Sequence, residues 1–381
     1  MYTNFYPEHE LFIESARRVF DKELRPNLKK WEEADNYPDE VYRILGRNGF
    51  LGLLISEDYG GVGGDYRLAS AWCEIFGELL AVGMTVGVNM HSVVVSSALQ
   101  RYGTAEAKSR WLPTAVTGEA IGAYAFTEPS VGSDLANCRT RAERRGDRWV
   151  INGSKTFITN GARANFILVL TRNDIKAGYK GFTTFVVDTK TPGFRVTKKL
   201  DKLGWRSSDT AELEFVDVEV DDSCILGNVG DGWIQAAKNL NWERLMLTLT
   251  ALGGGRACLR DALRYAKDRV AFGEPIIKFD AVAQMLSEMT RKLIMTEALA
   301  HAAVDKLCSG EEARAEVSVA KRIVCEDMIW LAYRAIQIHG GYGYTTEFSA
   351  EQWWRDLRLM TIGGGTSEIM GNIVARQLGL N

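Results

Sequence analysis

Cysteine and histidine, two side chains that often carry chemistry in proteins, are few and scattered in this 381-residue sequence. Its six cysteines include no Cys-x-x-Cys pair, and its four histidines are dispersed: His9, His91, His301 and His339. A structural zinc site needs several such ligands at short, regular spacing. We therefore expect buried or bystander thiols and no metal site.

Four other segments combine hydroxyl, glycine and charged residues in patterns that could hold a ligand. They are Tyr124–Asp134, Lys155–Gly161, Lys267–Gly273 with Gln284 downstream, and Gln337–Tyr344 followed by Gly365–Glu368. Each segment alone is a weak signal. Their joint occurrence, in this order along the chain, makes a chance match improbable.

Together these segments resemble the acyl-CoA dehydrogenase family, and the likeness covers essentially the whole chain. The resemblance implies an enzyme that binds FAD and removes two hydrogens across the Cα–Cβ bond of an acyl thioester. Within the family, the chain is most similar to the branch that includes isovaleryl-CoA and long-chain acyl-CoA dehydrogenases.

A flavin held without a Rossmann fold needs hydroxyls and open backbone N–H groups around its ring and pyrophosphate. By resemblance, Thr127 and Thr159 lie at the ring, and Ser133 serves the pyrophosphate or the thioester arm of the substrate. Phe157 occupies a position where the family often stacks an aromatic side chain, although a phenylalanine in a strand is more often core. The further cofactor contacts implied are Tyr124, Phe126, Gly132, Gln284, Thr366 and Glu368.

A second set of cofactor contacts implies an assembly of identical subunits. Arg269 and Phe272 match family positions that reach the flavin of a neighbouring subunit, and an arginine fork suits a pyrophosphate. Gln337, Gly340 and Gly341 match the loop over the adenosine half of that flavin. We expect a homo-oligomer, a tetramer or a dimer. The alternative for Arg269 is a solvated charge at a helix end.

The implied reaction needs a carboxylate that takes the proton next to the thioester carbonyl, while hydride leaves the β-carbon. Most of the family carries this carboxylate just before a Thr-Ser pair, where this chain reads Ile362-Gly-Gly-Gly-Thr-Ser-Glu368 and has Gly364 instead. The isovaleryl and long-chain branch carries it as Glu-Arg-Leu, and this chain has Asn241-Trp-Glu-Arg-Leu-Met246. We therefore expect Glu243 to be the catalytic base, in preference to Glu368.

Other groups should assist this base. We expect Arg244 to organise the loop that contains Gly364, whose backbone N–H should bind the thioester carbonyl together with a ribityl hydroxyl of FAD. A water-excluded cleft should raise the pKa of the base. The substrate-lining residues implied are Ser133, Arg206, Ser207, Gly363 and Gly364, with turn closure as an equal alternative for Arg206 and Ser207.

Three regions must position these residues. Residues 1–119 repeat apolar side chains every three or four positions, which predicts an N-terminal helical domain. Residues 120–230 hold short β-branched and aromatic runs, which predict a middle β-domain, a small barrel or sandwich. Residues 231–381 return to the helical period and predict a C-terminal four-helix bundle, so the fold class is multi-domain α+β. The glycine-rich Asp58–Asp65 opens no strand-turn-helix pattern and indicates a chain reversal.

Composition narrows the partners. The chain is 46% hydrophobic and 25% charged, and its net charge of -3 offers no broad attraction for nucleic acid or an anionic membrane. No run reaches about 18 consecutive apolar residues. The first residues lack the features of a signal or transit peptide, so we expect a cytoplasmic protein. The resemblance adds an acyl-CoA substrate and an electron-transferring flavoprotein as electron acceptor.

Three alternatives remain open. The substrate could be an acyl or aminoacyl group on a carrier protein, which would need a basic docking patch near the mouth of the site. The chain could be a flavin oxidase or monooxygenase of the same architecture, which would leave the flavin open to oxygen. A non-catalytic flavin-binding or scaffold protein would tolerate replacement of Glu243 without loss of turnover.

Overall fold

The N-terminal region is helical, as its apolar periodicity predicts. The structure, a computed structural model, describes residues 5–380. Its helices here are α1 (Glu10–Val19), α2 (Leu28–Glu33), α3 (Glu40–Arg47), α4 (Tyr66–Phe76), α5 (Val82–Asn89), α6 (Ser97–Tyr102) and α7 (Ala105–Thr117). The Asp65 side chain caps α4 by accepting from Arg67 N and Leu68 N, which ends the glycine-rich loop and starts the helix.

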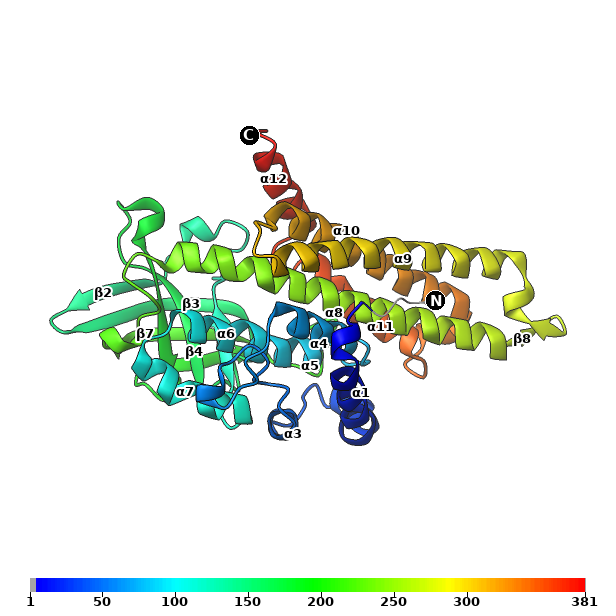
Figure 1. The fold of residues 1–381 in the computed structure, drawn as a ribbon, viewed down its shortest axis with the longest axis horizontal. Coiled ribbons are helices and arrows are strands. Elements are labelled where there is room, and N and C mark those ends of the chain that lie inside the picture. Colours follow the sequence, from blue (N-terminus) through cyan, green and yellow to red (C-terminus); the bar gives the residue numbers. More distant parts are fainter. Residues whose placement is uncertain (1–4, 381) are drawn as a thin grey trace.

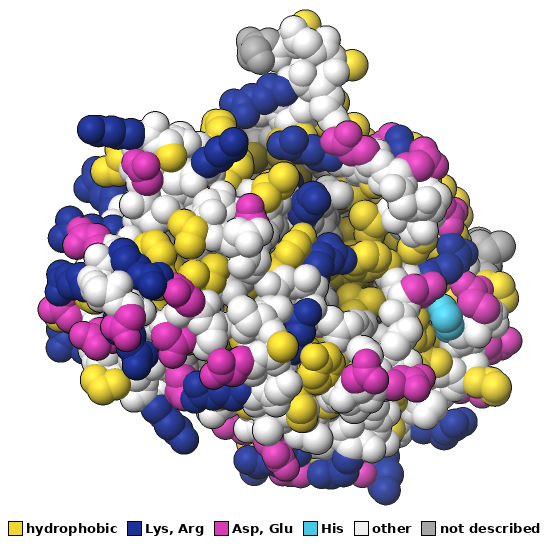
Figure 2. Space-filling model, turned by 60° about the vertical axis from the view of Figure 1, so that its left-hand side comes forward, with side chains coloured by type: hydrophobic (Ala, Val, Ile, Leu, Met, Phe, Trp, Pro, Cys, Tyr) yellow, Lys and Arg dark blue, Asp and Glu magenta, His cyan; other side chains and the backbone are white. Residues whose placement is uncertain are grey.

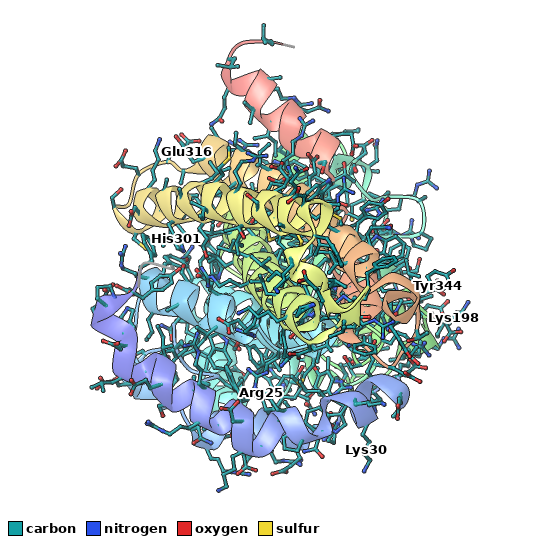
Figure 3. All side chains as sticks on the ribbon, turned by 90° about the vertical axis from the view of Figure 1, so that its right-hand side faces the viewer. Arg25, Lys30, Lys198, His301, Glu316 and Tyr344 are labelled. Atoms are coloured by element: carbon teal, nitrogen blue, oxygen red, sulfur yellow. The ribbon has the colours of Figure 1, made fainter. Side chains whose placement is uncertain are left out.

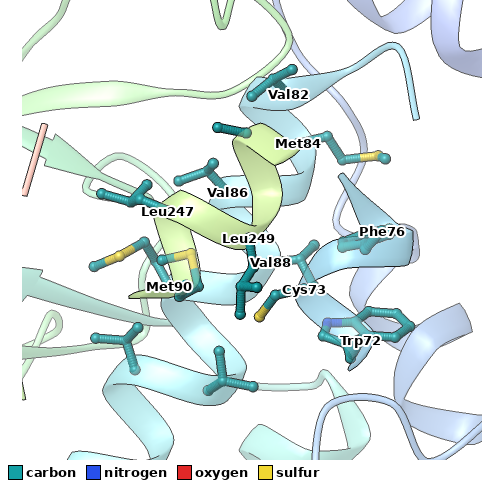
Figure 4. Packing of buried hydrophobic residues seen from close by; sticks show 14 of the residues in the cluster. Trp72, Cys73, Phe76, Val82, Met84, Val86, Val88, Met90, Leu247 and Leu249 are labelled. Carbon is teal, nitrogen blue, oxygen red and sulfur yellow. The ribbon is translucent and has the colours of Figure 1, made fainter. Parts of the chain in front are cut away.

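The helical run Val82–Tyr102 is rich in apolar residues. It is long and apolar enough to cross a membrane, with a hydropathy of 1.3, but 94% of its most apolar stretch is buried inside the protein. Figure 4 shows side chains of this run, including Val86, Val88 and Met90, packed beside Leu247 and Leu249 of α8 (Gly232–Asp268). The run is therefore a core element of this fold.

A curled sheet forms the middle region (Figure 1). Its strands are β1 (Gly122–Ala125), β2 (Arg141–Arg145), β3 (Arg148–Thr159), β4 (Phe166–Arg172), β5 (Phe182–Asp188), β6 (Phe194–Lys199) and β7 (Thr210–Val220). They run in the order β1-β4-β2-β3-β7-β6, and β5 pairs with β4. Alternation along β1 gives the sheet two apolar faces, because Ala123 and Ala125 join a separate sheet core while Tyr124 and Phe126 join the helical core.

Long helices return in the C-terminal region. They are α8, α9 (Asp280–Cys308), α10 (Arg314–His339), α11 (Ser349–Arg358) and α12 (Ser367–Gln377), with the short strands β8 (Val270–Ala271) and β9 (Glu274–Pro275) between α8 and α9. The 37 residues of α8 extend about 55 Å, from beside the sheet to the β8 end of the molecule (Figure 1). The predicted order of helices, sheet and helices, and the multi-domain α+β class, are confirmed.

Three successive glycines in the middle of α8 let three other helices approach it. A side chain at Gly253 would collide with the Glu74 carbonyl of α4, and one at Gly255 with the Met328 side chain of α10. At Gly254 it would lie 3.2 Å from the Trp353 ring of α11. The core of the helical regions is thus assembled around this point of α8.

A group of buried polar contacts joins all three regions. Trp205, in the loop between β6 and β7, donates from its backbone N to Asp356 Oδ1 at 2.6 Å and from Nε1 to the Asp356 carbonyl at 2.9 Å. Nearby, Ser207 N donates to Glu32 Oε2 at 3.0 Å, and Arg355 lies 3.3 Å from Glu32 Oε1. Burial, and then the neighbouring Glu32 carboxylate, raise the pKa of Asp356 to about 7.

This junction predicts a pH-dependent stability. The folded protein keeps a proton on Asp356 up to about pH 7, whereas an unfolded aspartate releases it near pH 4. The contribution of Asp356 is therefore lost as the pH rises between these values. We compare the melting temperature of Asp356→Asn with that of wild type at two pH values. The decrease caused by the substitution should be smaller at about pH 8 than at about pH 5, or should become an increase. Parallel melting profiles for wild type and variant would contradict this, and the exposed Asp147→Asn is the control.

Candidate functional site

Glu243 lies in the half of α8 that packs beside the sheet, and its side chain is buried, with 9% of the residue exposed. It faces the loop between α11 and α12. A Cβ placed on Gly364 of that loop would lie 3.8 Å from Glu243 Oε1 and 2.8 Å from Leu247 Cδ1. A carboxylate on residue 364 would thus enter the space that the Glu243 carboxylate already occupies.

Two buried cations from different helices hold this loop. Arg244 Nε donates to the Gly364 carbonyl at 3.0 Å, and Lys321 Nζ of α10 donates to the Gly365 carbonyl. Both glycines have left-handed backbone angles, with φ of 67° and 106°, which other residues rarely adopt. Sequence reasoning missed Lys321, because nothing near it in the chain indicates that α10 reaches this loop.

The surroundings of Glu243 suit a base that works near neutral pH. Burial raises the pKa of Glu243 to about 7, against the opposing effects of the Arg244 and Lys321 charges. Among residues 5–380, no group donates a hydrogen bond to this carboxylate. A desolvated carboxylate with free oxygen atoms and such a pKa can exchange a proton with a bound molecule.

A second group of predicted residues meets at one corner of the sheet. Thr127 follows β1 and is tied to β3 by the 3.0 Å hydrogen bond from Thr156 N to its carbonyl. An irregularity in the pairing of β3 with β7, between Lys155 and Ile158, places Phe157 with φ of 58° and leaves it 68% exposed. Phe157 is therefore not a core residue. Its open ring, with Thr127 and Thr159 half-buried nearby, fits a flat polar ring system such as a flavin.

A buried ion pair fixes this corner. Lys155 Nζ lies 2.9 Å from Glu128 Oε1 and donates to the Phe126 carbonyl at 3.0 Å, while Arg139 N and Thr140 N donate to the Glu128 carboxylate. Burial alone would raise the pKa of Glu128, but Lys155 and these hydrogen bonds hold it at about 2. Both residues lie in segments selected from the sequence, yet only the fold shows that they pair.

The residues predicted to contact a neighbouring subunit lie at the opposite end of α8. Arg269 follows Glu243 by 26 residues, roughly 39 Å along the helix. Phe272 is 98% exposed, and Gln337, Gly340 and Gly341 lie on the surface, in the segment that ends at Tyr344 (Figure 3). One chain therefore does not bring these residues to the site around Glu243.

The remaining predicted residues are dispersed. Gly132 and Ser133 lie on an exposed loop, Gln284 is exposed on α9, and Glu368 is exposed in the first turn of α12, which Thr366 caps. Arg206 pairs with Asp35 at 2.7 Å and Ser207 is buried at the domain junction, so the contacts found for both join their loop to the N-terminal region.

The surface near the sheet end of the molecule is hollowed. On the face turned forward in Figure 2, hydrophobic side chains gather in a hollow with Lys and Arg side chains beside it. At Gly363, an added Cβ would have only the Leu359 carbonyl within 4 Å, at 3.7 Å. The loop next to Glu243 therefore leaves open space beside Gly363.

All three regions of the chain match domains of one known protein family. The sequence matches the acyl-CoA dehydrogenase N-terminal domain over residues 6–119, the middle domain over residues 123–218 and the C-terminal domain over residues 230–379.

Curated relatives align over nearly the full length. The chain is 35% identical to a 3-(aryl)acrylate reductase of Clostridium sporogenes, over 98% of this chain and 99% of that one. It is 34% identical to the mitochondrial long-chain specific acyl-CoA dehydrogenase of Rattus norvegicus, over 98% and 87%, and to the mitochondrial isovaleryl-CoA dehydrogenase of Solanum tuberosum, over 96% and 89%.

Solved structures agree with the fold. An acyl-CoA dehydrogenase from Geobacillus kaustophilus has a TM-score of 0.94 at 36% identity, with 98% of each chain covered. A chain from work on the electron transferring flavoprotein of Acidaminococcus fermentans has a TM-score of 0.95 at 31% identity, with 99% of each covered. The FAD complex of PigA has a TM-score of 0.95 at 26% identity, with 100% of each covered.

The buried ion pair beside Thr127 gives a test of the sheet corner. Lys155→Met leaves the Glu128 carboxylate buried without its cation, a change that costs about 3–5 kcal/mol. We expect a lower melting temperature and less FAD retained per chain after purification, because the Phe126 carbonyl also loses its donor. The exposed Lys198→Met is the control (Figure 3). Unchanged melting and flavin content would show that the pair does not support the corner.

Proposed function

The chain belongs to the acyl-CoA dehydrogenase family, and on that premise we propose that it oxidises an acyl-CoA at its Cα–Cβ bond, with Glu243 as the base. FAD is the cofactor of this family and supplies the hydride acceptor when it is bound. The observation that carries the proposal is the position of Glu243, whose carboxylate fills the space facing Gly364.

We assign a separate role in the proposed reaction to each of three residues, Glu243, Gly364 and Arg244. With a pKa of about 7, a substantial fraction of Glu243 is ionised at neutral pH and can take the α-proton. Negative charge then develops on the thioester oxygen, and the backbone N–H of Gly364 is the proposed donor to it. Arg244 keeps the loop in place through the Gly364 carbonyl. The same glutamate, once protonated, can return a proton when the reaction runs toward reduction.

The open loop side of the site supports a wide acyl group. Gly363 and Gly364 carry no side chains, and the space beside Gly363 is open. The relatives include enzymes named for isovaleryl, long-chain and 3-(aryl)acrylate substrates, which differ in width near the β-carbon. We propose an acyl group that is branched, long or aryl-bearing, with a carrier-bound thioester as the alternative.

The proposed partners follow from the family and from the far end of α8. An electron-transferring flavoprotein is the proposed electron acceptor, supported by the similarity to a chain from such a system. Arg269 and Phe272 lie too far from Glu243 to serve the same site, so we propose that they complete the cofactor site of a second copy in a tetramer or dimer. The proposed location is the cytoplasm.

Replacement of the base tests the reaction directly. Glu243→Gln keeps the shape of the side chain but cannot accept the proton, so anaerobic bleaching of bound flavin by acyl-CoAs should slow by at least about 10³-fold. Rapid-mixing absorbance would measure it, with a panel of acyl-CoAs and carrier-bound acyl groups that also identifies the thioester class.

Glu368→Gln is the matched comparison, because Glu368 is the rival carboxylate and lies exposed in the first turn of α12. Bleaching retained in Glu243→Gln and lost in Glu368→Gln would move the base to Glu368. Bleaching retained in both variants would show that neither glutamate is the base. A wild-type protein that binds no flavin would overturn the proposed function.

The width of the site gives a second test. Gly363 has no left-handed backbone angle, so a leucine there is tolerated by the chain and fills the open space. Gly363→Leu should lower kcat/KM for isovaleryl-CoA and for 3-phenylpropionyl-CoA about 10–100-fold more than for butyryl-CoA. An equal loss for all three substrates would show that Gly363 does not line the acyl pocket. Gly371→Leu, on the outer helix α12, is a control substitution.

A further inference from the structure

Lys321 is a buried ammonium without an ion-pair partner among residues 5–380. It is 1% exposed, and its Nζ donates to one carbonyl, that of Gly365. Burying an ammonium costs several kcal/mol unless other groups compensate it, so a lysine retained at such a position is a candidate for function. The reaction proposed above leaves Lys321 without a role.

The charged groups that face Lys321 come from two helices. Burial lowers the pKa of Lys321, and Arg244 of α8 lowers it further, whereas Glu243 of α8 favours the charged form; on α10 itself, the Cys325 thiol lies one turn away. Burial raises the pKa of Cys325 to about 11, so this thiol stays neutral at physiological pH. Burial likewise raises the pKa of Tyr124 of β1, whose phenol faces Glu243 from the sheet and stays neutral. Glu243 is therefore the carboxylate that shares this pocket with the two cations.

The backbone between these groups is intrinsically loose. Residues 363–365 are three glycines, and each left-handed glycine carries a large conformational entropy in the unfolded chain. Arg244 and Lys321 hold the successive carbonyls of Gly364 and Gly365 from opposite helices. Two adjacent peptide groups are fixed by these bonds, and with them the direction in which residue 364 faces Glu243.

We propose that Lys321 is a positioning residue for proton abstraction, which fixes the Gly364–Gly365 backbone opposite Glu243 and keeps a positive charge beside that carboxylate. The inference rests on the proposed role of Glu243 as the base. Without the cation, burial would act on Glu243 with one opposing charge fewer, and its pKa would rise.

Three variants separate the charge of Lys321 from its hydrogen bond. Lys321→Met removes both, Lys321→Gln keeps a donor without charge, and Lys321→Arg keeps both. In the FAD-loaded enzyme, the rate of flavin bleaching by substrate should fall on the acid side of about pH 7 in wild type. This acid limb should move up by about one pH unit in Lys321→Met and Lys321→Gln, and remain near wild type in Lys321→Arg. The rate at neutral pH should drop about tenfold or more in Lys321→Met.

An infrared titration supplies a readout that does not depend on turnover. The band of the protonated carboxyl that is absent in Glu243→Gln reports the pKa of Glu243, which should rise in Lys321→Met and Lys321→Gln. Lys306 is half-buried on α9 and pairs with Glu316, and Lys306→Met is the control that should leave both readouts unchanged. If Lys321→Met does not fold, the comparison of Lys321→Gln with Lys321→Arg carries the test, with far-ultraviolet circular dichroism as the folding check.

The outcomes separate the two proposals. An acid limb and a carboxyl band that do not move in Lys321→Met and Lys321→Gln overturn the role of Lys321, even if the rate falls, because a purely structural loss changes the rate alone. Loss of turnover in Glu243→Gln together with this result leaves the base assigned. Full turnover in Glu243→Gln overturns both proposals.

Discussion

The burial of one carboxylate constrains the rest of the site. Glu243 lies away from water beside a glycine loop, and burial sets its pKa near neutrality. A carboxylate in such a place is useful only if the loop opposite stays at a fixed distance, and three consecutive glycines do not hold themselves. Arg244 and Lys321 supply what the loop lacks, at the cost of burying two further charges.

The same principle recurs at the sheet corner. Lys155 and Glu128 are buried together and fix the segment that carries Thr127, beside the strand on which the Phe157 ring is exposed and Thr159 is half-buried. Both parts of the site thus depend on buried ion pairs or ammonium–carbonyl contacts that join elements distant in the chain. Helix and strand propensities place the elements, and these polar contacts set the distances between them.

The sequence predicts features that depend on neighbouring residues, and it does not predict contacts between residues far apart in the chain. Apolar periodicity locates the three regions, and the Glu-Arg-Leu pattern with the glycine at position 364 selects Glu243, because both signals are local. Lys321, the Glu128–Lys155 pair and the Trp205–Asp356 contact join residues 27 to 151 positions apart and have no local signature. For Arg206 the local pattern favours substrate contact and turn closure equally, and its pairing with Asp35, 171 residues away, likewise has no local signature.

The glycines at the midpoint of α8 affect how the protein reaches its folded state. Each of Gly253, Gly254 and Gly255 costs about 1 kcal/mol of helix stability relative to alanine, so the centre of this long helix gains little from forming by itself. It becomes favourable when α4, α10 and α11 dock against the bare backbone. We therefore expect the half of α8 that carries Glu243 and the half that ends at Arg269 to become one continuous helix during folding only when the helical regions pack together.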